Sequence, residues 1–124
     1  MKKRNLLLIV GSIVILGGIV LFMFHIPQRV VDDVLYDNYD HYLPCSSLPK
    51  KAEVEQVVRD HAAVVDRIRA VSADVEFQID TEKCPGQDRA DLIVSYPGHS
   101  QRLEIEQILG GKTFFGIPTR WRNW

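Results

Sequence analysis

The sequence lacks the commonest short motifs of catalytic sites. Its 124 residues include no HExxH pair, no G-x-S-x-G nucleophile turn and no glycine–lysine–serine phosphate loop. The spacing of an EF-hand is also missing, as is any N-x-S/T acceptor for glycosylation. No residue pattern therefore assigns an enzymatic activity, and we expect neither a cofactor nor a bound metal.

Cysteine is scarce, because the chain has only Cys45 and Cys84. Their spacing excludes a CxxC redox site. In an oxidising compartment the two residues allow one pairing, and we predict a disulfide between them. The closed loop of about 40 residues would stabilise the fold by on the order of 3–4 kcal/mol. Two free thiols are the alternative.

Charged side chains are missing from residues 6–26, and the run stays apolar until His25. As a helix it would be about 31 Å long, close to the hydrocarbon thickness of a bilayer. A signal peptide has a shorter apolar core of about 7–15 residues and a cleavage site of small residues. Here no Ala, Gly or Ser occurs between Gly18 and Ser46. A buried core helix would carry a polar face. We therefore predict an uncleaved transmembrane anchor over residues 6–26.

Two glycines of this run, Gly11 and Gly18, lie seven residues apart. Small residues on one face of a membrane helix allow another helix to approach closely, so both are candidate packing positions. The alternative is that glycine is simply frequent in membrane spans.

Charge is distributed unequally around the apolar run. Residues 1–5 contain three basic side chains and are predicted to be cytoplasmic by the positive-inside rule. Residues 28–124 contain all 16 acidic residues and 12 of the 15 basic ones, a formal charge of 12 − 16 = −4. An acidic domain is a poor candidate for nucleic-acid binding. We expect a single-pass protein of the cell membrane with its C-terminal domain outside the cytoplasm.

The part after the apolar run is long enough for one modest hydrophobic core. Residues 27–48, rich in Asp and Tyr, are predicted to be a juxtamembrane connector, and residues 49–124 an α+β domain. Apolar side chains at three-and-four spacing predict a helix over residues 49–71. Strict alternation predicts a half-buried strand at residues 74–80, and the more apolar residues 90–96 predict a central strand.

The remaining segments are less definite. Residues 100–109 fit a helix capped by Ser100 and ended by Gly110, or a strand that enters a hairpin, and the composition favours the helix. Residues 112–118 are predicted to be the last strand, whereas residues 30–36 fit either a helix or a strand. The expected fold is a small two-layer α+β sandwich, with helices packed on one face of a sheet of three or four strands.

Two sets of side chains are candidates for a functional site. Carboxylates and histidines gather in the connector and in one turn, where they combine ligand types that bind metals without a recognised spacing. This set is Asp37, Asp40, His41 and His99. The end of the chain interleaves cations and aromatic rings, which are enriched in protein interfaces. The predicted partner-binding set is Phe115, Arg120, Trp121, Arg122 and Trp124.

The aromatic and basic end of the chain has two other interpretations. It fits packing on its own domain through cation–π contacts, and it fits contact with a membrane surface, where Trp and Arg are favoured. The leading hypothesis is a non-enzymatic binding or assembly subunit of an envelope or membrane complex, held by the lipid bilayer and by a protein partner. The alternatives are a small metal-dependent or hydrolytic enzyme that uses His41 or His99, and a ligand-sensing domain.

Overall fold

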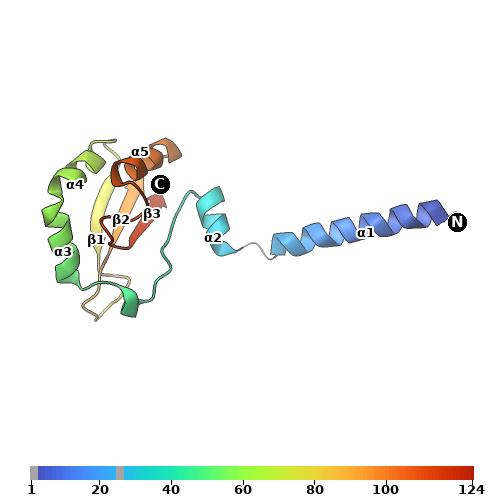
Figure 1. Cartoon of the computed structure of the whole chain (residues 1–124), viewed down its shortest axis with the longest axis horizontal. Coiled ribbons are helices and arrows are strands. Elements are labelled where there is room, and N and C mark those ends of the chain that lie inside the picture. Colours follow the sequence, from blue (N-terminus) through green and yellow to red (C-terminus); the bar gives the residue numbers. More distant parts are fainter. Residues whose placement is uncertain (1–2, 25–26) are drawn as a thin grey trace.

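A computed structural model describes residues 3–24 and 27–124 of the chain (Figure 1). Its elements combine helices with a small mixed sheet, so the α+β class predicted from the sequence is confirmed. In chain order they are α1 (Lys3–Phe24), α2 (Gln28–Val30), a π-helical turn (Val31–Leu35), a 3-10 turn (Cys45–Ser47), α3 (Lys51–Asp60), α4 (Ala62–Arg69), β1 (Glu76–Asp80), β2 (Asp91–Tyr96), α5 (His99–Leu109) and β3 (Thr119–Asn123).

The sheet within these described residues has the strand order β1-β2-β3. Strands β1 and β2 are antiparallel, whereas β2 and β3 are parallel and are connected through α5. The predicted central strand is confirmed as β2, which is buried at all but one of its positions. A strand covered on both sides needs apolar residues at successive positions, and DLIVSY supplies most of them.

The last strand begins later than predicted. Residues 112–118 form a tight turn in which Phe114 and Ile117 face each other, and β3 follows at Thr119. Phe115 and Gly116 have φ angles of 50° and 85°, which a continuous strand does not allow. The prediction of a strand over residues 112–118 is therefore wrong.

The long predicted helix is present as two consecutive helices, α3 and α4. The break lies at His61, whose backbone has φ −119° and ψ 32°. The apolar stripe continues across the break, because Val54, Val65 and Ile68 are all buried. The three-and-four spacing thus gave the buried face correctly, although it did not indicate the break.

Residues 99–109 are helical, as their composition favoured, and α5 is followed by Gly110 with φ 72°. This left-handed conformation is one that glycine adopts without steric cost, and the Gly111 N–H then donates to the Glu106 carbonyl at 3.1 Å. The predicted cap is wrong, because the helix is preceded by Gly98 and the Ser100 hydroxyl donates to the side chain of Gln101.

The core lies between the sheet and the helices. Helix α4 contacts both β1 and α5, and α5 contacts β2, so these two helices cover one face of the sheet. The buried side chains come from every element of the domain and from the turn before β3. The largest of them are Trp121, Tyr96, Phe114, Leu48, Ile68, Leu92 and Ile105.

The predicted disulfide is confirmed. Cys45 and Cys84 are bonded, with an S–S distance of 2.05 Å and their Cα atoms 5.8 Å apart. Cys45 lies in the 3-10 turn at the end of the connector, and Cys84 lies in the loop between β1 and β2. The bond therefore fastens the C-terminal end of the connector to the sheet.

Helix α1 extends away from the rest of the chain in Figure 1. Residues 25–26 of the span predicted at 6–26 lie outside the described residues. Among the residues that are described, no helix is both long and apolar enough to cross a membrane. The structure thus does not support the predicted transmembrane anchor. A packing role for Gly11 and Gly18 stays a prediction, since no atom beyond the local backbone of α1 lies within 4 Å of a Cβ built at either glycine.

Candidate binding site at the connector

The connector packs against the domain and pairs with its last strand. The Tyr39 N–H donates to the Trp121 carbonyl at 3.0 Å, and the Trp121 N–H donates to the Tyr39 carbonyl at 2.8 Å. Beside them the Asn123 N–H donates to the Asn38 side-chain oxygen at 2.7 Å. The connector thereby forms a short antiparallel edge next to β3, after the helical segment that ends at Leu35.

A buried arginine of α5 holds the acidic part of the connector. Arg102 donates from Nη2 to Asp33 at 2.8 Å, from Nη1 to Asp37 at 2.7 Å and from Nε to Glu106 at 3.1 Å. Burial works to lower the pKa of Arg102, but the hydrogen bonds to Asp33 and the other carboxylates outweigh it and raise that pKa. The arginine therefore stays charged, and the carboxylates of the connector neutralise it.

A second arginine network crosses the sheet. Arg120 of β3 donates from Nε to Asp91 Oδ2 at 2.7 Å and from Nη2 to Asp91 Oδ1 at 2.9 Å, and it also binds Asp80. The Asp91 side chain is fully buried. Each strand thus contributes one member, and the two-point contact fixes the plane of the guanidinium.

His41 belongs to this second network and has no ring nitrogen available for chemistry. The Leu43 N–H donates to His41 Nδ1 at 3.0 Å, so this nitrogen carries no proton. His41 Nε2 therefore carries the proton and donates to Asp91 Oδ2 at 2.8 Å. A general base or a metal ligand needs an accessible lone pair, which this arrangement does not offer.

The predicted metal-ligand set is not brought together. His99 Nδ1 lies 2.8 Å from Asp37 Oδ1, on the side of Arg102. His41 Nδ1 lies 3.9 Å from Asp40 Oδ1, and His41 belongs to the Arg120 network. Asp37 Oδ1 also accepts from Arg102, a cation that competes with a metal for the same oxygen. In the described part of the chain, no three His, Cys, Asp or Glu residues are grouped to hold a metal ion.

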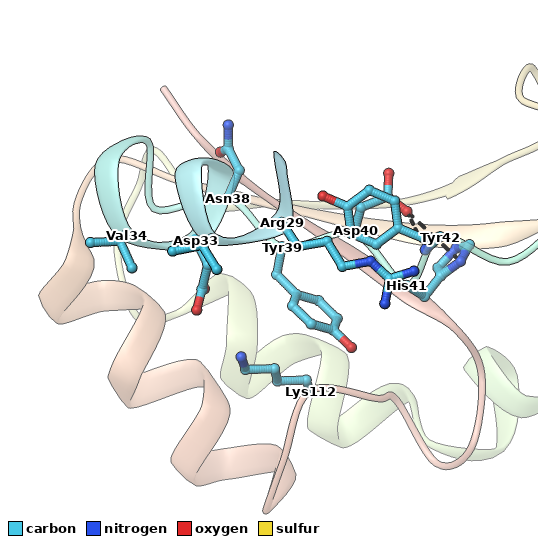
Figure 2. Close-up of a pocket in the computed structure, with 10 residues that line it drawn as sticks. Arg29, Asp33, Val34, Asn38, Tyr39, Asp40, His41, Tyr42 and Lys112 are labelled. Carbon is cyan, nitrogen blue, oxygen red and sulfur yellow. Dashed lines mark hydrogen bonds and ion pairs between the residues drawn. The ribbon is translucent and has the colours of Figure 1, made fainter. Parts of the chain in front are cut away.

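A cavity lies between the connector and the loop after α5. It is a cleft of about 270 Å³, lined from the connector by Arg29, Tyr39 and Tyr42 and from the loop by Lys112. Figure 2 shows Tyr39 projecting from the connector toward Lys112, and Arg29 extending toward Tyr42. The Lys112 ammonium lies 4.4 Å from the ring centroid of Tyr39, and the Arg29 guanidinium carbon lies 4.4 Å from that of Tyr42.

One buried residue, Trp121, positions two walls of the cleft. Its backbone pairs with Tyr39, and its indole N–H donates to the Lys112 carbonyl at 2.9 Å. Trp121 has no exposed surface, so its own position is fixed by the core. The core therefore sets the distance between the connector wall and the loop wall.

The carboxylates that line the cleft are already bound by cations. Asp33 binds Arg102, and Asp40 lies 3.2 Å from Arg122 and 3.6 Å from Lys83. Burial works to raise the pKa of Asp40, but the Tyr42 N–H and the neighbouring cations outweigh it and leave that pKa below 3.8, its ordinary value. Asp40 is therefore ionised at neutral pH.

The two cations of the cleft have no such partners. Within the described ranges 3–24 and 27–124, neither Arg29 nor Lys112 lies within 4.0 Å of a carboxylate oxygen. Each instead lies over the face of a tyrosine ring, which attracts a cation without neutralising it. Arg29 and Lys112 are therefore the cations of the cleft that are still able to pair with an anionic ligand.

The aromatic and basic end of the chain is distributed between the core and the surface. Trp121 is in the core, so its side chain is not available to a partner of the folded domain. Arg120 and Arg122 form ion pairs with carboxylates of the domain and the connector. Phe115 and Trp124 are 50% and 69% exposed. Partner binding by these two exposed rings stays a prediction.

Asp40 and His41 line the cleft and were candidates selected from the sequence, although as metal ligands, whereas its cations Arg29 and Lys112 were not selected. A signal existed for Arg102, which lies three positions before the buried Ile105 on the inward stripe of α5. A charged residue at such a position needs a buried partner, and the nearby connector is rich in Asp. Arg29 and Lys112 carried no comparable signal, since lone basic residues are common on surfaces.

Comparison of this chain with known protein families, with curated proteins and with solved structures finds no match.

Proposed function

We propose that this chain is a membrane-attached, extracytoplasmic subunit that binds or assembles with a protein partner. The observation that carries the proposal is the exposed apolar surface of α1. The large apolar side chains described from Leu6 to Val20 are 45% to 73% exposed. Each such side chain gains about 1.5–3 kcal/mol when it is fully buried away from water. A lipid bilayer is the environment that covers an apolar helix on all sides.

The disulfide and the charge distribution support the orientation of this proposal. The Cys45–Cys84 bond is typical of an oxidising compartment, outside the cytoplasm. The three basic residues at positions 2–4 favour a cytoplasmic N-terminus under the positive-inside rule. The domain that follows the connector would then lie on the outer side of the membrane.

Assembly with a partner is the second part of the proposal. Phe115 stacks on His61 with ring centroids 3.5 Å apart and leaves half of its surface in solvent. Trp124 is more exposed, although its indole N–H donates to the Asp74 carbonyl at 3.0 Å. Exposed aromatic rings held in fixed orientations are good anchors for a protein interface.

Membrane attachment is tested with the full chain in sealed membrane vesicles. We expect it to resist extraction by alkaline carbonate and to expose the domain, but not the N-terminus, to protease on the outer side. Val14→Lys places a charge on α1 and is expected to release the protein. Leu103→Lys, on an exposed apolar residue of α5, is the matched control and leaves attachment unchanged. Extraction of the unchanged chain by carbonate would overturn the proposal.

Assembly is tested by the mass of the unreduced particle after gentle extraction from its native membrane. We expect a particle that contains this chain and a second protein. Phe115→Ser and Trp124→Ser are expected to reduce the amount of that particle, whereas Leu103→Ser, which changes another exposed apolar residue, is not. A particle that contains only this chain would overturn the assembly part.

A further inference from the structure

The cleft at the connector contains two cations and two tyrosine rings, and most of its lining residues come shortly after α1 in the sequence. Arg29 and Lys112 approach it from opposite walls, and both lie over tyrosine rings at 4.4 Å. The nearest carboxylates of the connector already have partners. Asp33 binds Arg102, Asp40 binds Arg122, and Asp32 accepts hydrogen bonds from Gln28 and Tyr42.

An anion with several oxygens fits this arrangement. A guanidinium presents a planar fork of donors and an ammonium presents a mobile point charge, and together they are a common phosphate-binding pair. A cleft of about 270 Å³ is slightly below the usual range for drug-sized ligands, so it suits a small polar group. Lys112 is held in place by its backbone, because its carbonyl accepts from the buried Trp121 indole.

The position of Arg29 relative to α1 indicates where the anion would come from. It follows Phe24, the last residue of α1, by 29 − 24 = 5 positions. Five residues span at most about 18 Å even when fully extended. This step rests on the proposed function: if α1 is embedded in a bilayer, the cleft lies at the depth of the lipid headgroups, where tyrosine is also favoured.

We propose that this cleft binds a phosphate ester through Arg29 and Lys112, and that the ester is the headgroup of an anionic phospholipid. The site would hold the domain in a fixed orientation on the membrane, in addition to the attachment by α1. The same chemistry would accept a soluble phosphate ester, so the test includes both sources.

The experiment uses the full chain in nanodiscs, with the Arg29 side-chain N–H followed by NMR. One preparation contains phosphatidylcholine alone, one adds phosphatidylglycerol, and one adds soluble glycerol 3-phosphate to the first. We expect phosphatidylglycerol to shift the Arg29 signal, and Lys112→Gln to weaken this response about tenfold, as the loss of one charge-assisted hydrogen bond predicts. Glycerol 3-phosphate is expected to have a much smaller effect at equal concentration.

Lys50→Gln is the matched control. Lys50 is exposed, precedes α3 and, like Lys112, has no carboxylate oxygen within 4.0 Å among the described residues. Both substitutions remove one positive charge, so a loss shared by both would reflect general attraction to an anionic surface and would overturn the site. An equal response to both esters would overturn the lipid as source, and no response to either would overturn the cleft as a phosphate site.

These outcomes separate the inference from the proposed function. If the chain inserts into nanodiscs but shows no response to phosphate esters, the proposed membrane attachment stands and only the proposed phosphate site is overturned. A chain that does not insert would overturn both the proposed membrane attachment and the phospholipid as the source of the phosphate ester. In that case glycerol 3-phosphate still tests the cleft in solution.

Discussion

Arg102 and Arg120 are both largely buried and both bound by carboxylates, but they connect different parts of the molecule. Arg120 links the three strands of the sheet, because it lies on β3 and its partners Asp80 and Asp91 lie on β1 and β2. Arg102 joins α5 to the connector through Asp33 and Asp37. The Arg120 network stabilises the domain, and the Arg102 network decides where the connector lies on it.

The partners of the two arginines also differ in exposure. The Asp91 side chain has no exposed surface, whereas 44% of the Asp33 side chain is in solvent. An exposed carboxylate that loses its partner is solvated by water, but a buried one is left as an uncompensated charge. The two networks are therefore expected to differ in energy even though both use a guanidinium and two aspartates.

The largest effect is expected from Arg120→Met. This change leaves Asp91 buried without a cation, and such a broken pair costs about 3–5 kcal/mol of unfolding free energy. Urea unfolding followed by far-UV circular dichroism measures it. Adding Asp91→Asn to Arg120→Met should recover a large part of the loss, because the unpaired charge is removed. A loss below about 1 kcal/mol for Arg120→Met would show that water reaches Asp91.

The disulfide is expected to have the next largest effect. Cys45 and Cys84 are 39 positions apart, and closing a loop of that size stabilises the fold by about 3–4 kcal/mol in the chain-entropy model. The paired change Cys45→Ser with Cys84→Ser should lower the urea midpoint accordingly, and reduction of the unchanged chain should match it. Retention of the full midpoint would mean that ion pairs alone fasten the connector.

A smaller and more local effect is expected from Arg102→Met. It removes the contacts to Asp33 and Asp37, with a loss of about 2–3 kcal/mol, since Asp33, which is 44% exposed, can be solvated by water. Amide hydrogen exchange should accelerate at Tyr39, the connector residue that pairs with β3. It should stay slow in the centre of β2. Glu104→Gln, at an exposed position of α5, is the control. Uniform acceleration across the sheet would contradict the separation of the two networks.

The elements of the fold could be predicted where a repeating pattern covered the whole element. The apolar stripe of residues 49–71 and the apolar run of β2 follow directly from burial on one or two faces. The β3 strand also alternates, with Thr119 and Trp121 buried, but its arginines made it look like a surface tail. Because each arginine had a carboxylate partner elsewhere in the chain, charge was a poor guide to exposure.

The cleft could not be predicted, because it depends on contacts between distant parts of the sequence. Arg102 is 69 positions from Asp33 and 65 from Asp37, and many other pairings were possible on charge alone. The turn before β3 brings Lys112 to the connector only because the Trp121 indole holds its carbonyl. A single sequence contains these residues but not the choice of partners.

The smallest effect concerns Asp40, a connector carboxylate that binds neither Arg102 nor Arg120. Burial works to raise its pKa, but the Tyr42 N–H, Lys83 and Arg122 outweigh it, so the folded-state pKa lies below 3.8, its ordinary value. A carboxyl group with a lowered folded-state pKa stabilises the fold above the unfolded-state pKa, and this stabilisation is lost as the pH falls through the folded-state pKa.

Asp40→Asn removes the charge and keeps an oxygen that can accept from the Tyr42 N–H. At neutral pH the variant should be less stable by under about 1 kcal/mol, because its partners are partly exposed and solvent screens them. The difference should shrink as the pH falls below 3.8, where the unchanged carboxyl group also becomes neutral. Urea unfolding of both chains at a series of pH values measures this convergence. A difference that persists in acid would show that the charge of Asp40 does not cause it, and the connector would then be fastened by charge at Arg102 alone.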